Sequence, residues 1–260
     1  MHADSAYVMG MGHRVCQDYA RAGSHANLAY GIVSDGCSSS PDTDVGARLL
    51  ALTAERLCKQ YSDEGRFKID IPRVARVAES AREIFVSTLP CESLDATLLV
   101  LVAQENVVKA SFMGDGAIAA RLPYGDLLIW EAEAPDGYPR YPNYLNNNAR
   151  KANVEAGDRW VVRLSNGGEY STRDVIAFNQ DIEDADVVAV FSDGVRSFTD
   201  AERNPIPGAS VIAELMDFKG YHGAFVQRRL YAFMRAAAKR GWRHEDDVAM
   251  AAIHMAVEED

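Results

Sequence analysis

Cysteine is scarce in this sequence: Cys16, Cys37, Cys58 and Cys91 are the only four among 260 residues, and no two of them form a Cys-x-x-Cys pair. That spacing argues against a zinc site and predicts free thiols in a reducing compartment. The N-terminus lacks the basic region and apolar core of a signal peptide, and no apolar run has the length of a transmembrane helix. We therefore expect a cytoplasmic protein with no membrane partner.

Basic residues are also fewer than acidic ones. The chain has 27 Lys and Arg against 38 Asp and Glu, which gives a net charge of −11. This balance argues against nucleic acid or an anionic membrane as the main partner. The sequence also lacks a Pro/Gly/Ser-rich linker, a low-complexity tract and an internal repeat. We therefore expect one domain over residues 1–260.

Three helices are predicted from apolar residues that recur at helical spacing. The first starts with Asp42 or Asp44 as its cap, and the second is capped by Asp70 with Pro72 in its first turn. The residues expected to face the core are Val45, Leu49 and Leu52 in the first helix, Val74, Val77, Ala81 and Phe85 in the second, and Val226, Leu230, Phe233 and Ala237 in the third.

Apolar runs typical of strands occur in blocks. They lie at residues 27–34, in a series with short turns over 96–132, and again at 185–192 and 248–257. Consecutive strands joined by short turns are antiparallel. Strands in blocks and helices in pairs do not fit the strict alternation of a parallel α/β fold. The pattern predicts an α+β fold in which helix pairs pack outside antiparallel sheets.

The segment at about 133–159 differs from the rest of the chain. It is rich in Pro, Gly, Asn and Tyr, and its apolar residues do not recur at the spacing of a helix or a strand. Long irregular segments inside compact domains are usually functional or mobile. We expect a flap-like segment here that selects substrates.

Three apolar runs end in an aspartate followed by glycine, at Asp35, Asp115 and Asp193. Asp-Gly is a strong signal for a hairpin turn. Asp115 fits that interpretation well because apolar runs lie on both sides of it. The other two fit it poorly, because neither is followed by a strand. Two aspartates at the ends of buried strands therefore need another explanation.

Asp18 precedes the first buried strand, and Asp246 precedes the last one. If the strands lie side by side, these carboxylates can gather with the Asp-Gly aspartates at one end of the sheets. Unpaired buried carboxylates are costly, so such a cluster persists where cations bind it. Aspartates and water suit Mg²⁺ or Mn²⁺. Two such ions about 3.5–4 Å apart can share a hydroxide and clamp an in-line displacement at phosphorus.

Five motifs, in order, carry a resemblance to a known family: "CQDYA", "GIVSDGCSSS", "DATLLVLVAQENVVKASFMGDGAIAARL", "VVAVFSDGV" and "EDDVAMAAI". Together they resemble the metal-dependent serine/threonine protein phosphatases of type 2C (the PPM family), and the opening "GH…CQD" looks like the bacterial branch. The resemblance covers residues 10–257. It implies two packed antiparallel β-sheets flanked by helix pairs, an α-β-β-α sandwich.

The resemblance also implies roles for individual residues. Asp35 matches the carboxylate that bridges two metal ions, Mn²⁺ or Mg²⁺, and Gly36 matches the residue whose carbonyl holds one of them. Asp193 and Asp246 match ligands of the other ion. Asp18 matches an acidic residue that holds metal-bound water.

Asp115 matches the aspartate linked to a third, more weakly held ion in bacterial members, and Asp247 stands where many members have asparagine. The sequence departs from the family at the phosphate-binding arginine. His13 is aligned with that position, and Arg14 lies beside it. His13 is expected to contact phosphate or donate a proton, as a catalytic residue beside Asp18 and Asp35; its other interpretation is a surface or capping histidine. Arg140 either steers a phosphopeptide or belongs to a solvated charge cluster.

The resemblance implies an enzyme that hydrolyses phosphoserine or phosphothreonine on proteins by in-line attack of a metal-bridging hydroxide. Its partners would be a phosphorylated protein and a cognate serine/threonine kinase. The missing arginine motivates an alternative, a catalytically weak metal-binding pseudophosphatase that acts as a regulatory or binding module. A phosphatase of small phosphate esters is a third interpretation, because a fold cannot identify the substrate.

Overall fold

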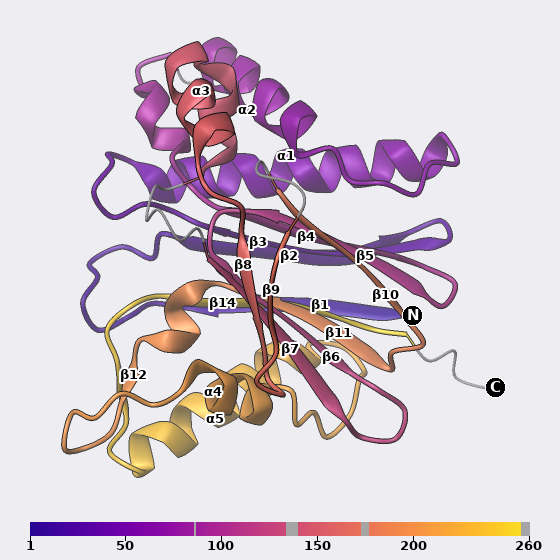
Figure 1. Ribbon diagram of the computed structural model, residues 1–260, viewed down its shortest axis with the longest axis vertical. Helices are drawn as coiled ribbons and strands as arrows, with labels where there is room; N and C mark the ends of the chain where they lie inside the picture. Colours follow the sequence, from indigo (N-terminus) through magenta and orange to yellow (C-terminus); the bar gives the residue numbers. More distant parts are fainter. Residues whose placement is uncertain (86, 134–139, 173–176, 256–260) are drawn as a thin grey trace.

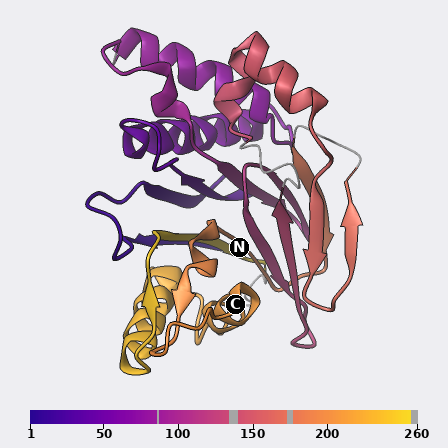
Figure 2. The ribbon, with the colours of Figure 1, turned by 60° about the vertical axis from the view of Figure 1, so that its left-hand side comes forward.

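Two β-sheets lie face to face in the computed structural model, with helices on the outer face of each (Figure 1). The structure describes residues 1–85, 87–133, 140–172 and 177–255. Figure 2, a turned view, separates the layers into helices, sheet, sheet and helices. The predicted α+β fold of two packed antiparallel sheets flanked by helix pairs is confirmed.

The larger sheet has seven strands in the order β1-β14-β11-β6-β7-β8-β9, and neighbouring strands are antiparallel throughout. Its strands are β1 (His2–Val8), β6 (Gly116–Arg121), β7 (Leu127–Glu133), β8 (Val161–Leu164), β9 (Glu169–Ser171), β11 (Val187–Phe191) and β14 (Val248–His254).

The smaller sheet has five antiparallel strands in the order β10-β5-β4-β3-β2. These strands are β2 (Asp18–His25), β3 (Leu28–Asp35), β4 (Leu98–Gln104), β5 (Val107–Met113) and β10 (Phe178–Glu183). A separate two-stranded ribbon pairs β12 (Phe198–Thr199) with β13 (Arg243–His244).

Helices α1 and α2 cover the smaller sheet, and α4 and α5 cover the larger one (Figure 1). The α-helices are α1 (Thr43–Asp63), α2 (Ile71–Phe85), α3 (Asn148–Ala156), α4 (Gly208–Leu215) and α5 (Phe225–Lys239). Short 3₁₀ helices are η1 (Cys91–Leu94), η2 (Pro142–Asn146) and η3 (Asp193–Arg196). No helix in the described part of the chain is both long and apolar enough to cross a bilayer.

Strand β14 shows why its sequence is apolar without alternation. Ala251 and Ile253 face the core between the two sheets, while Met250 and Ala252 pack toward α4 and α5. A strand with both faces buried needs apolar residues at every position. The two sheets and the helix layers are therefore held together by hydrophobic burial on both faces of this strand.

The inward face predicted for α1 is wrong. Val45 and Leu52 are 37% and 46% exposed, and Leu49 is only partly buried. The helix instead buries a face that contains Leu50, Leu57 and Tyr61 together with Gly46. A Cβ atom built at Gly46 would lie 1.6 Å from the Ser93 carbonyl oxygen. The helix has apolar residues on two faces, and the face with Gly46 is the buried one because only glycine allows this close approach.

The other two predicted faces had different outcomes. In α5 the predicted residues are all buried, as the pattern indicated. In α2, Val74 is buried, but Phe85 is 82% exposed in the last turn. Asp70 caps α2 as predicted, because its carboxylate accepts a hydrogen bond of 3.0 Å from the Arg73 N–H.

The prediction of an irregular segment at 133–159 is wrong for much of its length, because η2 and α3 lie within it. Asn147 caps α3, since its side-chain oxygen accepts hydrogen bonds from the N–H groups of Ala149 and Arg150. Residues 134–139 lie outside the described residues. The many aromatic residues and asparagines in this segment did not indicate a helix, and α3 has only one buried residue, Val154, so it lacks an apolar pattern.

Glu55 joins α1 to the smaller sheet through an ionic network around its own buried carboxylate. Its carboxylate accepts hydrogen bonds from Arg21 Nε, the Tyr30 hydroxyl and Lys59 Nζ, each at 2.8 Å. Burial raises the pKa of Glu55, but the hydrogen bonds from Arg21, Lys59 and Tyr30 outweigh burial and lower the pKa to about 2. The ionised form therefore stabilises the fold.

We expect Glu55→Gln to destabilise the protein by about 1.5–3 kcal/mol at pH 7, the scale of hydrogen bonds to a charged group. The folded-state pKa is depressed, so the advantage of wild type is complete above the ordinary pKa of 4.5 and is lost as the pH falls toward about 2. Urea unfolding of both proteins from pH 7 to pH 3 measures this. Glu83→Gln, at a side chain that is 64% exposed on α2, is the matched control. A constant difference across that pH range would contradict the ionic explanation.

Candidate active site

The register of β2 and β3 places Asp18 directly opposite Asp35. Asp18 opens β2 and is 2% exposed, and Asp35 closes β3. The Asp35 N–H donates to Thr97 Oγ1 at 3.0 Å, and the Thr97 N–H donates to the Asp35 carbonyl at 2.8 Å. The Gly36 N–H donates to the Gln17 carbonyl at 3.2 Å. Backbone pairing therefore fixes this end of the smaller sheet.

The larger sheet brings Asp193 and Asp246 to the same end. Asp193 follows β11, Asp246 and Asp247 precede β14, and these two strands are antiparallel neighbours. Gly194 allows the approach, since a Cβ atom there would lie 1.7 Å from the Asp247 carbonyl oxygen. The charge of Asp246 adds to the effects of burial and of Asp115, which raise the pKa of Asp193.

Two serines that precede the Asp-Gly pairs connect the cluster, and the sequence analysis missed them. Ser192 Oγ donates to Asp18 Oδ2 at 2.7 Å and accepts from the Ala249 N–H at 2.9 Å. Ser34 Oγ donates to the Thr97 carbonyl at 2.6 Å. Because Ser192 belongs to the larger sheet and Asp18 to the smaller one, one hydroxyl joins both halves of the site. The repeated Ser-Asp-Gly was the available signal.

The carboxylates of Asp18, Asp35 and Asp193 oppose one another's ionisation. Burial raises the pKa of Asp18 to about 8, against the hydrogen bonds from Ser192 and Asp35, and the charges of Asp247 and Asp193 add to the rise. Burial and then the charges of Asp18 and Asp193 raise the pKa of Asp35 well above its ordinary value. Burial and the Asp115 charge raise the pKa of Asp193 to about 6. The charge of Arg196 lowers the pKa of Asp193 but does not outweigh these effects, so the cluster carries more negative charge than the described residues around it compensate.

The donor atoms of this cluster suit a hard divalent cation. Asp18 Oδ1 and Asp193 Oδ1 are buried and have no hydrogen-bond partner in the structure. Carboxylate oxygens are the ligands that Mg²⁺ and Mn²⁺ prefer. Among the described residues, no three His, Cys, Asp or Glu side chains are already arranged as a complete ligand set. The residues thus fit such ions by chemistry and charge, and their side chains must adjust to bind them.

Asp115 lies at a corner between the two sheets, and its interpretation as a hairpin turn is wrong. It follows β5, which pairs with β4 and β10, and precedes β6, which pairs with β11 and β7. The two strands that flank Asp115 therefore never pair with each other. Its charge contributes to the raised pKa of Asp193, so the corner places Asp115 beside the cluster.

Asp247 holds the loop that precedes β2. Its carboxylate accepts hydrogen bonds from the Gly10 N–H at 2.7 Å and the Gln17 N–H at 2.6 Å. His13 of the same loop contacts both neighbouring aspartates, with Nδ1 3.0 Å from Asp247 Oδ2 and Nε2 3.5 Å from Asp246 Oδ1. His13 is therefore placed at the edge of the carboxylate cluster.

A hollow of about 370 Å³ opens beside this loop, and His13, Arg14 and Gln17 line it. The start of α1 forms its other wall with Asp42 and Asp44. Arg14 is exposed, so its guanidinium can reach a ligand in the hollow.

Arg140 does not join these residues. It is 1% exposed, its guanidinium lies 5.1 Å from the centre of the Trp160 ring, and it donates to the Asp158 carbonyl. Its contacts are those of a buried structural arginine, which is neither of the two roles considered from the sequence.

Asp95 connects the site to the segment that holds η2 and α3. It is the first residue of the third sequence motif, but the sequence analysis gave it no role. Its carboxylate accepts hydrogen bonds from Arg150 Nη1 at 3.0 Å, Asn143 Nδ2 at 3.0 Å and Ser40 Oγ at 3.2 Å. Its carbonyl accepts from the Cys37 N–H at 2.9 Å. The segment that holds η2 and α3 is thereby tied to the loop that follows Asp35.

A family model described as "Protein phosphatase 2C" matches residues 12–235 of this chain. The match spans Asp18, Asp35, Asp115 and Asp193 and stops before Asp246. A search of curated proteins found no match.

Solved structures show the same fold. The serine/threonine phosphatase Stp1 from Staphylococcus aureus is 12% identical with a TM-score of 0.58, and the alignment covers 99% of this chain and 96% of that one. A bacterial serine phosphatase is 13% identical with a TM-score of 0.57 over 100% of both chains. The structure of the PP2C phosphatase domain and part of the regulatory domain of SpoIIE from Bacillus subtilis is 11% identical with a TM-score of 0.54, over 97% of this chain and 63% of that one.

Proposed function

This chain belongs to the protein phosphatase 2C family, and we propose that it hydrolyses phosphoserine and phosphothreonine esters on proteins with two divalent metal ions. The observation that carries the proposal is the gathering of Asp18, Asp35 and Asp193 from two sheets into one cluster in which all three carboxyl pKa values are raised, although Arg196 partly offsets the charge at Asp193. A binding module has no need for such a cluster, which is costly when empty of cations.

In this proposal Asp35 would hold both ions, and the Gly36 carbonyl would help to hold one of them. Asp193 and Asp246 would hold the other ion, and Asp18 would accept a hydrogen bond from the attacking water. Bound Mn²⁺ or Mg²⁺ would neutralise the carboxylates, stabilise charge on the phosphoryl oxygens and lower the pKa of water. A third, weaker ion would be held beside Asp115.

His13 and Arg14 are proposed to bind the substrate phosphate in place of the family's arginine. Both line the hollow beside the cluster, and the contact with Asp247 fixes the imidazole of His13. A histidine held this way can donate a proton to the leaving serine or threonine oxygen. Arg14 supplies the fixed positive charge that an imidazole lacks at neutral pH.

The segment with η2 and α3 is proposed to select the substrate. Tyr141, which precedes η2, lies within electrostatic reach of Cys37 and Asp115. A protein substrate in the hollow would therefore meet this segment beside the reacting phosphate. A phosphoprotein substrate implies a cognate serine/threonine kinase.

The second candidate is a metal-binding pseudophosphatase. It is favoured by two observations: His13 stands where the family has arginine, and the described residues contain no preformed set of metal ligands. Such a protein would bind Mn²⁺ and a phosphoprotein but turn over slowly.

Hydrolysis of p-nitrophenyl phosphate and of a phosphothreonine peptide, each with Mn²⁺ and with EDTA, tests these functions. We expect both substrates to be cleaved with Mn²⁺, activity to fall to background in EDTA, and added Mn²⁺ or Mg²⁺ to restore it. Full activity in EDTA would contradict metal dependence. Mn²⁺ binding without cleavage of either substrate would identify the pseudophosphatase, and cleavage of p-nitrophenyl phosphate alone would indicate small esters.

A further inference from the structure

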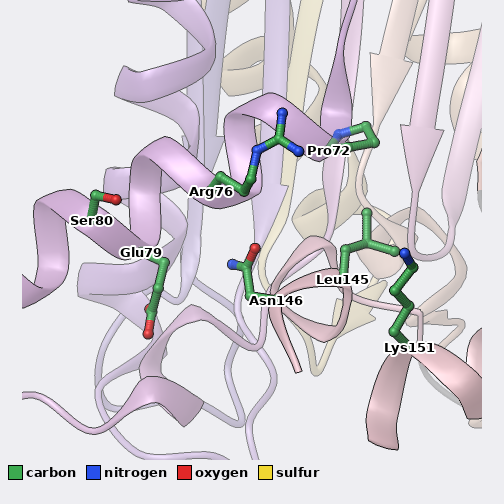
Figure 3. A pocket seen from close by; sticks show the side chains of 7 residues that line it. All are labelled: Pro72, Arg76, Glu79, Ser80, Leu145, Asn146 and Lys151. Carbon is green, nitrogen blue, oxygen red and sulfur yellow. The ribbon is translucent and has the colours of Figure 1, made fainter. Parts of the chain in front are cut away.

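A groove of about 480 Å³ lies between α2 and the segment that holds η2 and α3. Figure 3 shows its lining, with Pro72, Arg76, Glu79 and Ser80 from α2 and Leu145, Asn146 and Lys151 from the opposite side. Its volume is in the range of small-molecule sites. None of these residues belongs to the carboxylate cluster or to the hollow beside it.

The charge that this groove offers to a ligand is positive. Arg76 makes no hydrogen bond or ion pair with any residue that the structure describes. Glu79 is committed to Arg82, with two hydrogen bonds of 2.9 Å from Nε and Nη2. Lys151 has only a 3.6 Å contact with Glu155, which is 51% exposed, and such surface pairs are weak. Two cations are thus available in a protein whose net charge is −11.

The groove is preformed and has an apolar part. Asn146 Nδ2 donates to the Ala75 carbonyl at 3.1 Å, which fixes η2 against α2. Pro72 and Leu145 line the groove from opposite sides, and Ser80 lies at the end away from Lys151 (Figure 3). A ligand that carries both an anionic group and an apolar body would match this lining.

We propose that this groove binds a small organic anion with a phosphate or phosphonate group. Arg76 and Lys151 hold the anionic group, and the apolar body of the ligand lies against Pro72 and Leu145. Hydrogen bonds from two cationic side chains to a dianion are the strong, charge-assisted kind. This site is separate from the proposed phosphatase activity and does not depend on it.

The groove nevertheless adjoins the support of the active site. Lys151 follows Arg150, whose guanidinium binds Asp95 at 3.0 Å, and the Asp95 carbonyl accepts from the Cys37 N–H. Binding must therefore be measured apart from metal binding and catalysis. Chelated protein meets this need, because a phosphonate cannot then bind through metal ions in the carboxylate cluster.

Calorimetric titration of the full chain with phenylphosphonate in EDTA tests the proposal. The groove variant is Arg76→Gln with Lys151→Gln, and the matched control is Arg56→Gln with Lys239→Gln, which removes the same amount of charge elsewhere. We expect wild type and control to bind with equal Kd and the groove variant to bind at least about tenfold more weakly, the loss expected from even one charge-assisted hydrogen bond. Equal weakening in both variants, undiminished binding in the groove variant, or no binding by wild type would overturn the proposal. A protein with no phosphatase activity would leave this result unchanged.

Discussion

Asp35→Asn is expected to lower turnover of p-nitrophenyl phosphate by at least about 1,000-fold, since metal ions contribute several kcal/mol of transition-state stabilisation. Asp35 lies between Asp18 and Asp193, and its pKa is raised by burial and by both of their charges. A carboxylate in this position can serve both ions at once. Asparagine keeps the shape and removes the charge that both ions need.

The same substitution should have the opposite effect on the metal-free fold. A raised pKa means that the folded state disfavours the ionised carboxylate. Asp35→Asn removes that repulsion, so in EDTA it should melt at the same temperature as wild type or higher, while Mn²⁺ should stabilise it less. Asp181→Asn, at a side chain that is 62% exposed, is the control. Calorimetry that showed normal two-site Mn²⁺ binding by Asp35→Asn would refute the assignment.

The sheet architecture could be predicted from the sequence because its strands are long apolar runs in blocks. The run at 27–34 became β3 (Leu28–Asp35), and the last run became β14 (Val248–His254). Burial on both faces leaves a continuous apolar pattern that short turns interrupt.

Helix orientation was predictable only where bulky residues define the buried face. In α5, Leu230 and Phe233 are 0% and 1% exposed, as their spacing indicated. In α1, bulky apolar residues lie on two faces: Leu50 and Leu57 are buried, while Leu52 is 46% exposed. The close approach at Gly46 selects between these faces, and apolar periodicity alone does not detect it.

The aspartates of the site could be found because each ends or precedes a buried strand, which places Asp18 opposite Asp35 once the strands pair. The residues that support these aspartates could not be found in the same way. Asp95 and Arg150 are 55 residues apart in sequence and meet only after α3 packs beside η1 and η2. The placement of Arg140 against Trp160 likewise depends on tertiary packing, so composition alone misjudged it.

Asp115→Asn is expected to lower turnover by about 10- to 100-fold, on the scale of losing an outer group that tunes a metal site. The structure removes the competing explanation, since β5 and β6 lie in different sheets and form no hairpin. Asparagine preserves the size and turn chemistry of aspartate, so the change isolates the charge. That charge contributes to the raised pKa of Asp193, which places it where a third cation would be attracted.

The metal dependence of the rate distinguishes this role from a structural one. A site with few protein ligands keeps several waters and binds weakly, so wild type should show a phase at high Mn²⁺ concentration that Asp115→Asn lacks. Calorimetry should find tight binding at the first two ions unchanged. Asp126→Asn is the control, because Asp126 is an exposed turn aspartate between β6 and β7, which do pair. Wild-type turnover by Asp115→Asn across the whole Mn²⁺ titration would eliminate the third ion and leave Asp115 as a corner residue between the sheets.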